Sequence, residues 1–193
     1  MVLGIVVEGE FDSGVYRALI QRIRPDVDLV LSQPCEGVAG VRTKFVGRLE
    51  YFQSRPDYHV EKALVIRDSD CHDSRVLEDE LVRILDQSGF REKLTLPVHF
   101  YATRCMVETW LLADEGAVNK VARQRGRVRS ARPVADPLEG ATDAKKLFRQ
   151  MLSQAHLPAD KAVYAEVAAA ADLDRIRQRC PYFQRFIDCV HSC

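Results

Sequence analysis

Residues 63–70 have the sequence ALVIRDSD, in which a short apolar run ends in Asp68 and Asp70. A continuous apolar run of this length is typical of a strand that is buried on both faces of a parallel sheet. Residues 3–7, LGIVV, form a similar run that ends directly before Glu8. These stretches decide the fold, because they predict buried parallel strands that are each followed by acidic residues.

Strand and helix signals alternate along the first part of the chain. The predicted strands cover residues 3–7, 27–31, 63–66 and 98–102. Apolar residues at helical spacing predict helices at about 15–23, 41–52, 76–85 and 106–113. Asp12 or Ser13 is expected to cap the first helix. We therefore predict an α/β fold of the Toprim/Rossmann-like class, with a sheet of about four mainly parallel strands that is flanked by helices.

The predicted organisation is one α/β domain with a C-terminal extension. With 193 residues, the chain is close to the usual length of a single domain. The α/β core is expected at 1–118, a basic linker or loop at 119–140, and a helical C-terminal extension that packs on the core at 141–193. Within the extension, helices are predicted at 144–153, 160–171 and 175–190.

Composition limits the kinds of partner that the chain can attract. The charges of the 28 basic and 28 acidic residues cancel, so a nucleic acid could bind only through a local patch of basic residues. The opening apolar run is too short for a membrane helix, and we expect no membrane partner. The six cysteines form no C-x-x-C pair, which favours reduced thiols in a cytoplasmic protein.

Three acidic residues are candidates for a metal site. Asp68 and Asp70 are two residues apart, so both side chains point to the same side of an extended strand end. Glu8 follows another strand, and the carboxyl ends of parallel strands meet at one edge of a sheet. Carboxylate oxygens are the ligands that Mg²⁺ prefers, so the pattern predicts a site for Mg²⁺ or Mn²⁺. Glu108, soon after the fourth strand, is a conditional fourth ligand.

These motifs resemble a known family. The EGE motif at residues 8–10 with Asp12, followed by the DSD motif at 68–70, resembles the Toprim domain of topoisomerases, primases and overcoming-lysogenization-defect nucleases. The ETW motif at 108–110 and the CPYFQRF motif at 180–186 resemble a bacterial Toprim-like family that is often associated with defence ATPases. The resemblance therefore extends over nearly the whole chain.

The resemblance implies roles for individual residues. It implies that Glu8 is a metal ligand or general acid/base, that Asp68 and Asp70 hold Mg²⁺ or Mn²⁺, and that all three are catalytic together with Glu108. The related nucleases also use a basic residue, for which the candidates here are Lys145, Lys146 and Arg104. The implied chemistry is phosphodiester hydrolysis, in which a metal-bound water attacks phosphorus and basic groups neutralise the developing charge.

Two functions follow as expectations. The first is a cytoplasmic, Mg²⁺-dependent Toprim-type nuclease or phosphohydrolase that acts in bacterial anti-phage defence, together with a partner ATPase in a separate chain. A separate chain is needed because the sequence contains no G-x-x-x-x-G-K-[ST] motif. The second is a non-catalytic Toprim-like interaction subunit that binds a partner ATPase or a nucleotide.

A basic stretch without acidic residues lies between Glu115 and Asp136. Its members include the candidate nucleic-acid contacts Arg123, Arg125 and Arg127. Clusters of arginine favour phosphate binding through the release of counterions, regardless of base sequence. The alternative is a solvated surface loop, since the stretch lacks aromatic residues that would stack on single-stranded bases.

Structural alternatives also exist for the acidic residues. Asp70, Asp73 and Ser74 could cap the helix that follows the third strand, and such a role needs no ligand. Glu108 falls on a predicted helix, where an exposed glutamate is the commonest case.

Overall fold

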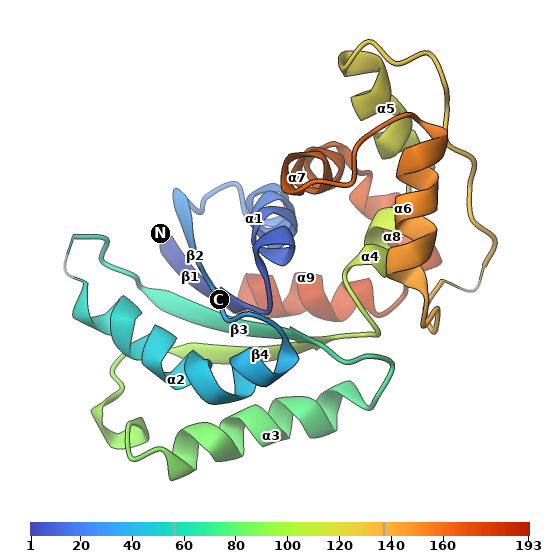
Figure 1. Ribbon diagram of the computed structural model, residues 1–193. Helices are drawn as coiled ribbons and strands as arrows, with labels where there is room; N and C mark the ends of the chain where they lie inside the picture. The colour runs from blue at the N-terminus through green and yellow to red at the C-terminus, as the bar shows by residue number, and fades with distance from the viewer. Residues whose placement is uncertain (56, 137) are drawn as a thin grey trace.

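A parallel sheet forms the centre of the protein. The computed structural model describes residues 1–55, 57–136 and 138–193. The strands are β1 (Val2–Val7), β2 (Leu29–Pro34), β3 (Lys62–Asp68) and β4 (Val98–Thr103). They lie in the order β2-β1-β3-β4, and every pair of neighbours is parallel (Figure 1). The predicted α/β fold with a four-stranded, flanked sheet is confirmed.

Helices follow each strand and continue to the C-terminus. The first three are α1 (Glu10–Ile23), α2 (Val38–Ser54) and α3 (Ser74–Gln87), with a 3-10 turn, η1, at Arg91–Lys93. The remainder are α4 (Glu108–Leu112), α5 (Glu115–Gln124), α6 (Ala144–Gln154), α7 (Lys161–Ala170), α8 (Leu173–Arg179) and α9 (Phe183–Ser192).

The two faces of the sheet are covered by different helices. Helices α2 and α3 lie on one face, and α1 and α9 lie on the other (Figure 1). Side chains alternate along β1 accordingly: Ile5 belongs to the core on the α1 side, whereas Val6 belongs to the core on the α2 side. Gly4 also faces α2, where a Cβ atom would lie only 2.8 Å from the Phe52 ring. Glycine at this position therefore allows α2 to approach the sheet closely.

The C-terminal helices pack on the sheet through aromatic side chains. Helix α7 lies along α1, where Phe11 and Tyr164 meet edge to face at 5.0 Å. Trp110 of α4 is fully buried and contacts the Phe183 and Phe186 rings of α9 at 4.8 and 5.0 Å. The extension thus shares one apolar core with β1 and α1.

Several predicted boundaries are wrong for identifiable reasons. The second strand lies at Leu29–Pro34 instead of 27–31, because Val27 is buried within a turn. The predicted linker at 119–140 begins inside helix α5, whose apolar face is buried. The predicted helix at 175–190 is broken into α8 and α9, because Pro181 has no amide hydrogen to continue it.

The predicted caps of the first helix are also wrong. Helix α1 begins at Glu10 with Gly9 as its N-cap, so Asp12 and Ser13 lie inside the first turn. Ser13 accepts a hydrogen bond from the Ser32 hydroxyl at 2.8 Å, which ties α1 to β2. Asp12 is not the N-cap, but its carboxylate accepts a hydrogen bond from the backbone of the N-cap residue Gly9.

No helix in the described part of the chain is long and apolar enough to cross a membrane.

Candidate acidic metal site

The acidic residues gather where the strands end. Glu8 follows β1 directly, Asp68 is the last residue of β3, and Asp70 lies two residues further on. Asp12 lies in the first turn of α1, and Glu108 is the first residue of α4. We call these five residues the acidic cluster. The fold brings together all four predicted acidic residues and adds Asp12.

A hydrogen bond joins the first two members of the cluster. The backbone N–H of Asp68 donates to Oε1 of Glu8 at 2.9 Å. The bond forms because β1 and β3 are paired neighbours, so their carboxyl ends lie side by side. The backbone N–H of Gly37 donates to the carbonyl oxygen of Glu8 at 2.7 Å and anchors the same turn. Glu8 is therefore held over the end of β3.

The loops that follow β3 and β4 are bonded to each other. The backbone N–H of Asp70 donates to the carbonyl oxygen of Cys105 at 2.9 Å, and the N–H of Cys105 donates to Oγ of Ser69 at the same distance. Asp70, Cys71 and Cys105 have φ values of 47°, 65° and 57°, in the left-handed region that is uncommon for side chains larger than glycine. These bonds hold Asp70 in place despite its unfavourable backbone conformation.

A disulfide bond between Cys71 and Cys105 links the same two loops. The expectation that all six cysteines are reduced thiols is therefore wrong. The pairing was not visible in the sequence, because the two cysteines are 34 residues apart and become neighbours only when β3 pairs with β4. Cys35, Cys180, Cys189 and Cys193 are free.

Asp68 lies in the most negative environment of the cluster. Burial raises the pKa of its carboxyl group well above the ordinary value, and repulsion from Asp12, Glu8, Glu108 and Asp70 raises it further. The four neighbouring charges that act most strongly on Asp68 are thus all carboxylates. Among the largest influences that the described residues exert on Asp68, no positive charge offsets them.

Glu8 and Asp12 respond to the same environment. Burial raises the pKa of Glu8 to about 7, against the opposing hydrogen bond from the Asp68 amide, and the charges of Asp12 and Asp70 add to the increase. Burial also raises the pKa of Asp12 to about 6, with a further contribution from Glu108. Asp12 is therefore electrostatically part of the site, although only its place beside the EGE motif in the sequence pointed to it.

Glu108 is not an exposed helix residue. It is only 4% exposed, because α4 follows β4 closely and turns into the interior. Burial raises the pKa of Glu108, whereas the charges of Lys145 and Arg149 lower it. The alternative of a solvated surface glutamate is wrong for this position.

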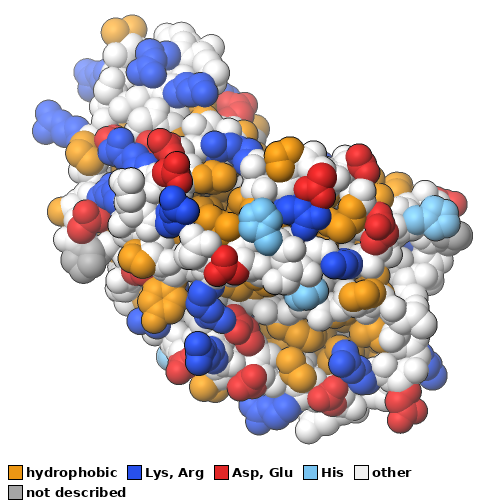
Figure 2. All heavy atoms as spheres, turned by 180° about the vertical axis from the view of Figure 1, so that it is seen from behind, with side chains coloured by type: hydrophobic (Ala, Val, Ile, Leu, Met, Phe, Trp, Pro, Cys, Tyr) orange, Lys and Arg blue, Asp and Glu red, His pale blue; other side chains and the backbone are white. Residues whose placement is uncertain are grey.

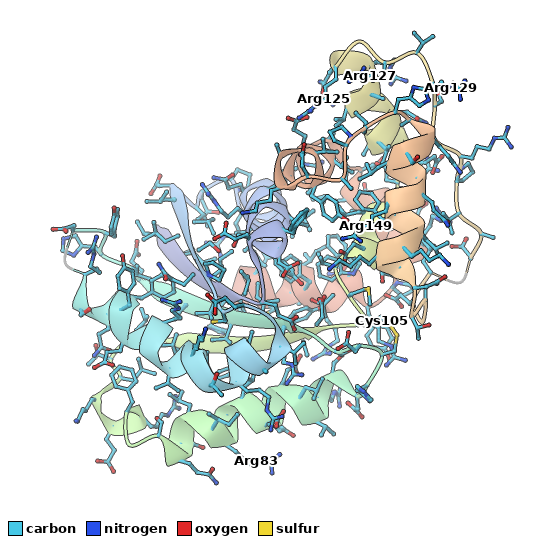
Figure 3. All side chains as sticks on the ribbon, viewed as in Figure 1. Arg83, Cys105, Arg125, Arg127, Arg129 and Arg149 are labelled. Atoms are coloured by element: carbon cyan, nitrogen blue, oxygen red, sulfur yellow. A yellow bond between two sulfur atoms is a disulfide. The ribbon has the colours of Figure 1, made fainter. Side chains whose placement is uncertain are left out.

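A basic groove borders the cluster on one side. Lys145, Lys146 and Arg149 of α6, together with Met106, line an open cavity of about 580 Å³. Lys145 acts on both Asp12 and Glu108, and Arg149 acts on Glu108. Figure 3 shows Arg149 on the side of α6 that faces α4. Sequence reasoning missed Arg149, although its spacing of four from Lys145 places both on one face of a helix.

Arg104 and the basic stretch have other side-chain partners. The Arg104 guanidinium stacks over the Tyr182 ring, with its carbon 5.1 Å from the ring centroid. Arg125 and Arg127 lie around the end of α5, far from Cys105 in Figure 3, and Arg123 is in the last turn of that helix. Arg125 forms a bidentate ion pair with Glu166, with N···O distances of 2.7 and 2.8 Å. The structure does not bring these three arginines of the stretch to the acidic cluster.

Residues 7–191 match the family model DUF4276, a domain of unknown function. The chain belongs to this family. The match spans the acidic cluster, the disulfide and the C-terminal helices of the DUF4276 chain. No curated protein and no solved structure matches it.

The side chains of the DUF4276 site are suitable ligands for a hard cation, but they are not arranged as a preformed metal site. Its donors are five carboxyl groups, and carboxylate oxygens are the usual protein ligands of Mg²⁺. Within residues 1–55, 57–136 and 138–193, no three His, Cys, Asp or Glu side chains converge closely enough to hold a metal ion. The donor set therefore fits the ion, whereas the side chains would have to close around it.

The surface of the DUF4276 chain carries charges of both signs. Figure 2 shows the side opposite to that of Figure 1, where acidic and basic side chains are mixed over most of the face. Basic side chains gather on the lobe that carries α5, to which the exposed residues Arg127 and Arg129 belong. A long, uniformly basic surface does not extend across this face.

Proposed function

We propose that this DUF4276 chain is a Toprim-type nuclease or phosphohydrolase that cleaves phosphodiester bonds and depends on Mg²⁺ or Mn²⁺. The observation that supports the proposal is the environment of Asp68, on which four carboxylates act most strongly. Several partly buried carboxylates in one place repel each other, and a divalent cation offsets that repulsion. The same group of residues carries the Toprim resemblance.

Glu8, Asp68 and Asp70 would hold the cation, with Asp12 and Glu108 as further oxygen donors. A bound divalent cation supplies a more acidic water molecule and neutralises charge on a phosphate. The hydrogen bond from the Asp68 amide orients Glu8, and the bonds between the two loops position Asp70. These contacts restrict the carboxylates before any ion binds.

The neighbouring groove supports a substrate that carries phosphate groups. The positive charge of Lys145 acts on Asp12 and Glu108, and that of Arg149 acts on Glu108. An acidic cluster alone would repel a nucleic acid, so adjacent positive charge is needed to hold its backbone. Lys146 lines the same groove and adds a third cation.

The proposal extends to the biological setting that the resemblance implies. We propose a role in bacterial anti-phage defence with an ATPase in a separate chain as partner. A nucleic acid, either DNA or RNA, is the proposed substrate.

The direct test is cleavage of plasmid, single-stranded DNA and RNA in Mg²⁺ or Mn²⁺, with and without EDTA. We expect the double variant Asp68→Asn/Asp70→Asn to lose cleavage by about a hundredfold or more, because it removes two ligand charges. The matched control is Asp79→Asn/Asp86→Asn, which removes two exposed carboxylates of α3 and should retain activity. Cleavage that survives the first double substitution, or that EDTA does not abolish, would contradict the proposal.

The second candidate is a non-catalytic subunit that binds a partner ATPase or a nucleotide. The observation in its favour is that no preformed group of metal ligands exists among the described residues. Manganese binding measured by calorimetry separates the two candidates. No Mn²⁺ binding, together with no cleavage when the ATPase is added, would favour the interaction subunit.

A further inference from the structure

A second cavity lies at the N-terminal end of α3. Its volume is about 390 Å³, and it is lined by Asp73, Ser74, Arg75, Arg104, Tyr182 and Arg185. These residues come from three separate parts of the chain: the start of α3, the loop after β4, and the junction of α8 with α9. We call this cavity the α3 pocket. It contains no member of the acidic cluster.

Two donors of the α3 pocket lack hydrogen-bond partners within the described residues. Ser74 is only 5% exposed, and its hydroxyl oxygen makes no hydrogen bond. The Nε atom of Arg104 is buried and also without a partner. A buried polar group without a partner is unfavourable, so such groups are uncommon unless a ligand or water completes them. Both atoms belong to residues that line the same cavity.

Two of the three arginines that line the α3 pocket are left without an ion pair among the described residues. Arg185 is paired with Glu78 at 2.9 Å, and Asp73 accepts a hydrogen bond from the backbone N–H of Arg75 as the N-cap of α3. Glu139 lies near Arg104, whose charge lowers the pKa of Glu139 against a larger increase from burial. The Arg75 and Arg104 side chains form no ion pair in the described part of the chain.

The groups that remain suit the oxygen atoms of a phosphate. Guanidinium groups bind phosphate through two parallel hydrogen bonds, a hydroxyl adds a third, and the N-terminus of a 14-residue helix favours negative charge. The Tyr182 ring, which is 43% exposed, packs against the Arg104 guanidinium and orients it. The α3 pocket therefore has the chemistry of an anion site that is independent of any metal.

The α3 pocket and the acidic cluster are built on the same two loops. Ser74 follows Asp70 by four residues, and Arg104 immediately precedes Cys105. The disulfide bond and the hydrogen bonds of Ser69 and Asp70 hold these loops together. A strand that occupies the cluster would therefore pass close to the α3 pocket.

We propose that the α3 pocket binds a phosphate group of the substrate strand next to the bond that is cleaved, an inference that rests on the proposed nuclease function. The phosphate could be a terminal monoester or an internal diester of the same strand. Both present the same oxygen atoms to Arg104, Arg75 and Ser74, and the test below distinguishes them.

The test measures binding of short fluorescent oligonucleotides by anisotropy in EDTA, where cleavage does not contribute. We expect Arg104→Ala to weaken binding about tenfold, which corresponds to the loss of a charged hydrogen bond. It should also reduce the salt dependence by about 0.7 in the slope of log K against log salt, as expected for one lost phosphate contact on a single strand. A disturbance of folding alone would not change this slope.

Controls separate the pocket from general effects of charge and folding. Arg83→Ala removes an arginine of α3 that projects away from the sheet (Figure 3), and it should leave the affinity and the slope unchanged. Ser74→Ala, which leaves every charge in place, should weaken binding by a smaller factor than Arg104→Ala. Thermal unfolding of each variant confirms that it is folded.

Oligonucleotides with a 5′-phosphate or a 5′-hydroxyl identify the source of the phosphate. If a terminal phosphate binds, the phosphorylated strand binds more tightly, and Arg104→Ala abolishes the difference. If an internal phosphate binds, both strands weaken equally in the variant. An affinity and slope that Arg104→Ala leaves unchanged for both strands would overturn the proposal. If the wild type binds oligonucleotides, Arg104→Ala weakens that binding as expected, and no metal-dependent cleavage is found, only the nuclease function is refuted.

Discussion

Glu8 and Asp12 show how a position in the fold changes the behaviour of a single carboxyl group. Their ordinary pKa values of 4.5 and 3.8 are raised to about 7 and about 6, chiefly because burial disfavours the charged form. A carboxyl group with a raised pKa binds its proton more tightly in the folded protein than in the unfolded chain. The folded state therefore begins to lose stability once the pH rises above the pKa of the group in the unfolded chain. The loss is complete above its pKa in the folded protein.

This sign leads to a prediction for the metal-free protein. Stability should fall as the pH rises from about 5 to about 8, because Glu8 and Asp12 must become charged next to other carboxylates. Glu8→Gln should reduce that fall, since the glutamine carries no charge at any pH. The measurement is the thermal unfolding midpoint in EDTA at several pH values.

Glu50→Gln provides the matched control, because Glu50 is exposed on α2 away from the cluster. Its pH dependence should equal that of the wild type. A midpoint that increases steadily between pH 5.5 and pH 8 in EDTA would show that the assigned environment of Glu8 is incorrect.

At the scale of elements, the loops after β3 and β4 connect the acidic cluster with the α3 pocket. Pairing of the two strands places Asp70 and Cys71 opposite Cys105. The loops are joined by a disulfide and by two hydrogen bonds, from the Asp70 amide to the Cys105 carbonyl oxygen and from the Cys105 amide to the Ser69 hydroxyl. These links restrict how far the two loops can move relative to each other.

The disulfide gives a prediction at this scale. The double variant Cys71→Ser/Cys105→Ser should be less stable by about 2–4 kcal/mol, because it removes a cross-link that limits the unfolded chain. Urea unfolding of the oxidised protein and of the variant provides the measurement. Reducing agent should destabilise the wild type by a similar amount and leave the variant unaffected.

A count of thiols in the denatured, unreduced protein checks the pairing directly. Four reactive thiols are expected, from Cys35, Cys180, Cys189 and Cys193. Six reactive thiols would show that the bond does not form.

Over the whole molecule, the α/β core and the C-terminal helices behave as one packing unit. Helix α7 covers α1, and Phe186 of α9 contacts Tyr16, Tyr101 and Trp110, which belong to α1, β4 and α4. The charges of Lys145 and Arg149 act on the acidic cluster because this packing brings α6 beside α4. The helical extension therefore contributes to the site as well as to stability.

We therefore predict a single cooperative unfolding transition. Calorimetry should give one peak whose calorimetric and van't Hoff enthalpies agree. Phe186→Ala should shift the entire peak to lower temperature, with a loss of about 3–5 kcal/mol. Val76→Ala, at a position that is exposed on α3, should change the stability little. Two separate peaks, or a shift of only part of the signal, would contradict the shared core.

Local sequence pattern was sufficient to predict the elements of the sheet and the acidic residues at its edge. Apolar runs of strand length identified all four strands, and parallel pairing follows from the long helical connections. Glu8, Asp68 and Asp70 were predicted because each follows a strand, and the carboxyl ends of parallel strands share one edge. Boundaries were less accurate where an apolar residue is buried without belonging to a strand, as at Val27.

The tertiary structure decided which other residues join these carboxylates. Asp12 belongs to the cluster because α1 begins at Glu10, and Glu108 is buried because α4 turns inward. The disulfide and the α3 pocket each combine segments that are far apart in the sequence, and their contacts depend on strand pairing and helix packing. Sequence periodicity carries information about near neighbours along the chain, whereas such contacts form only when the whole core is assembled.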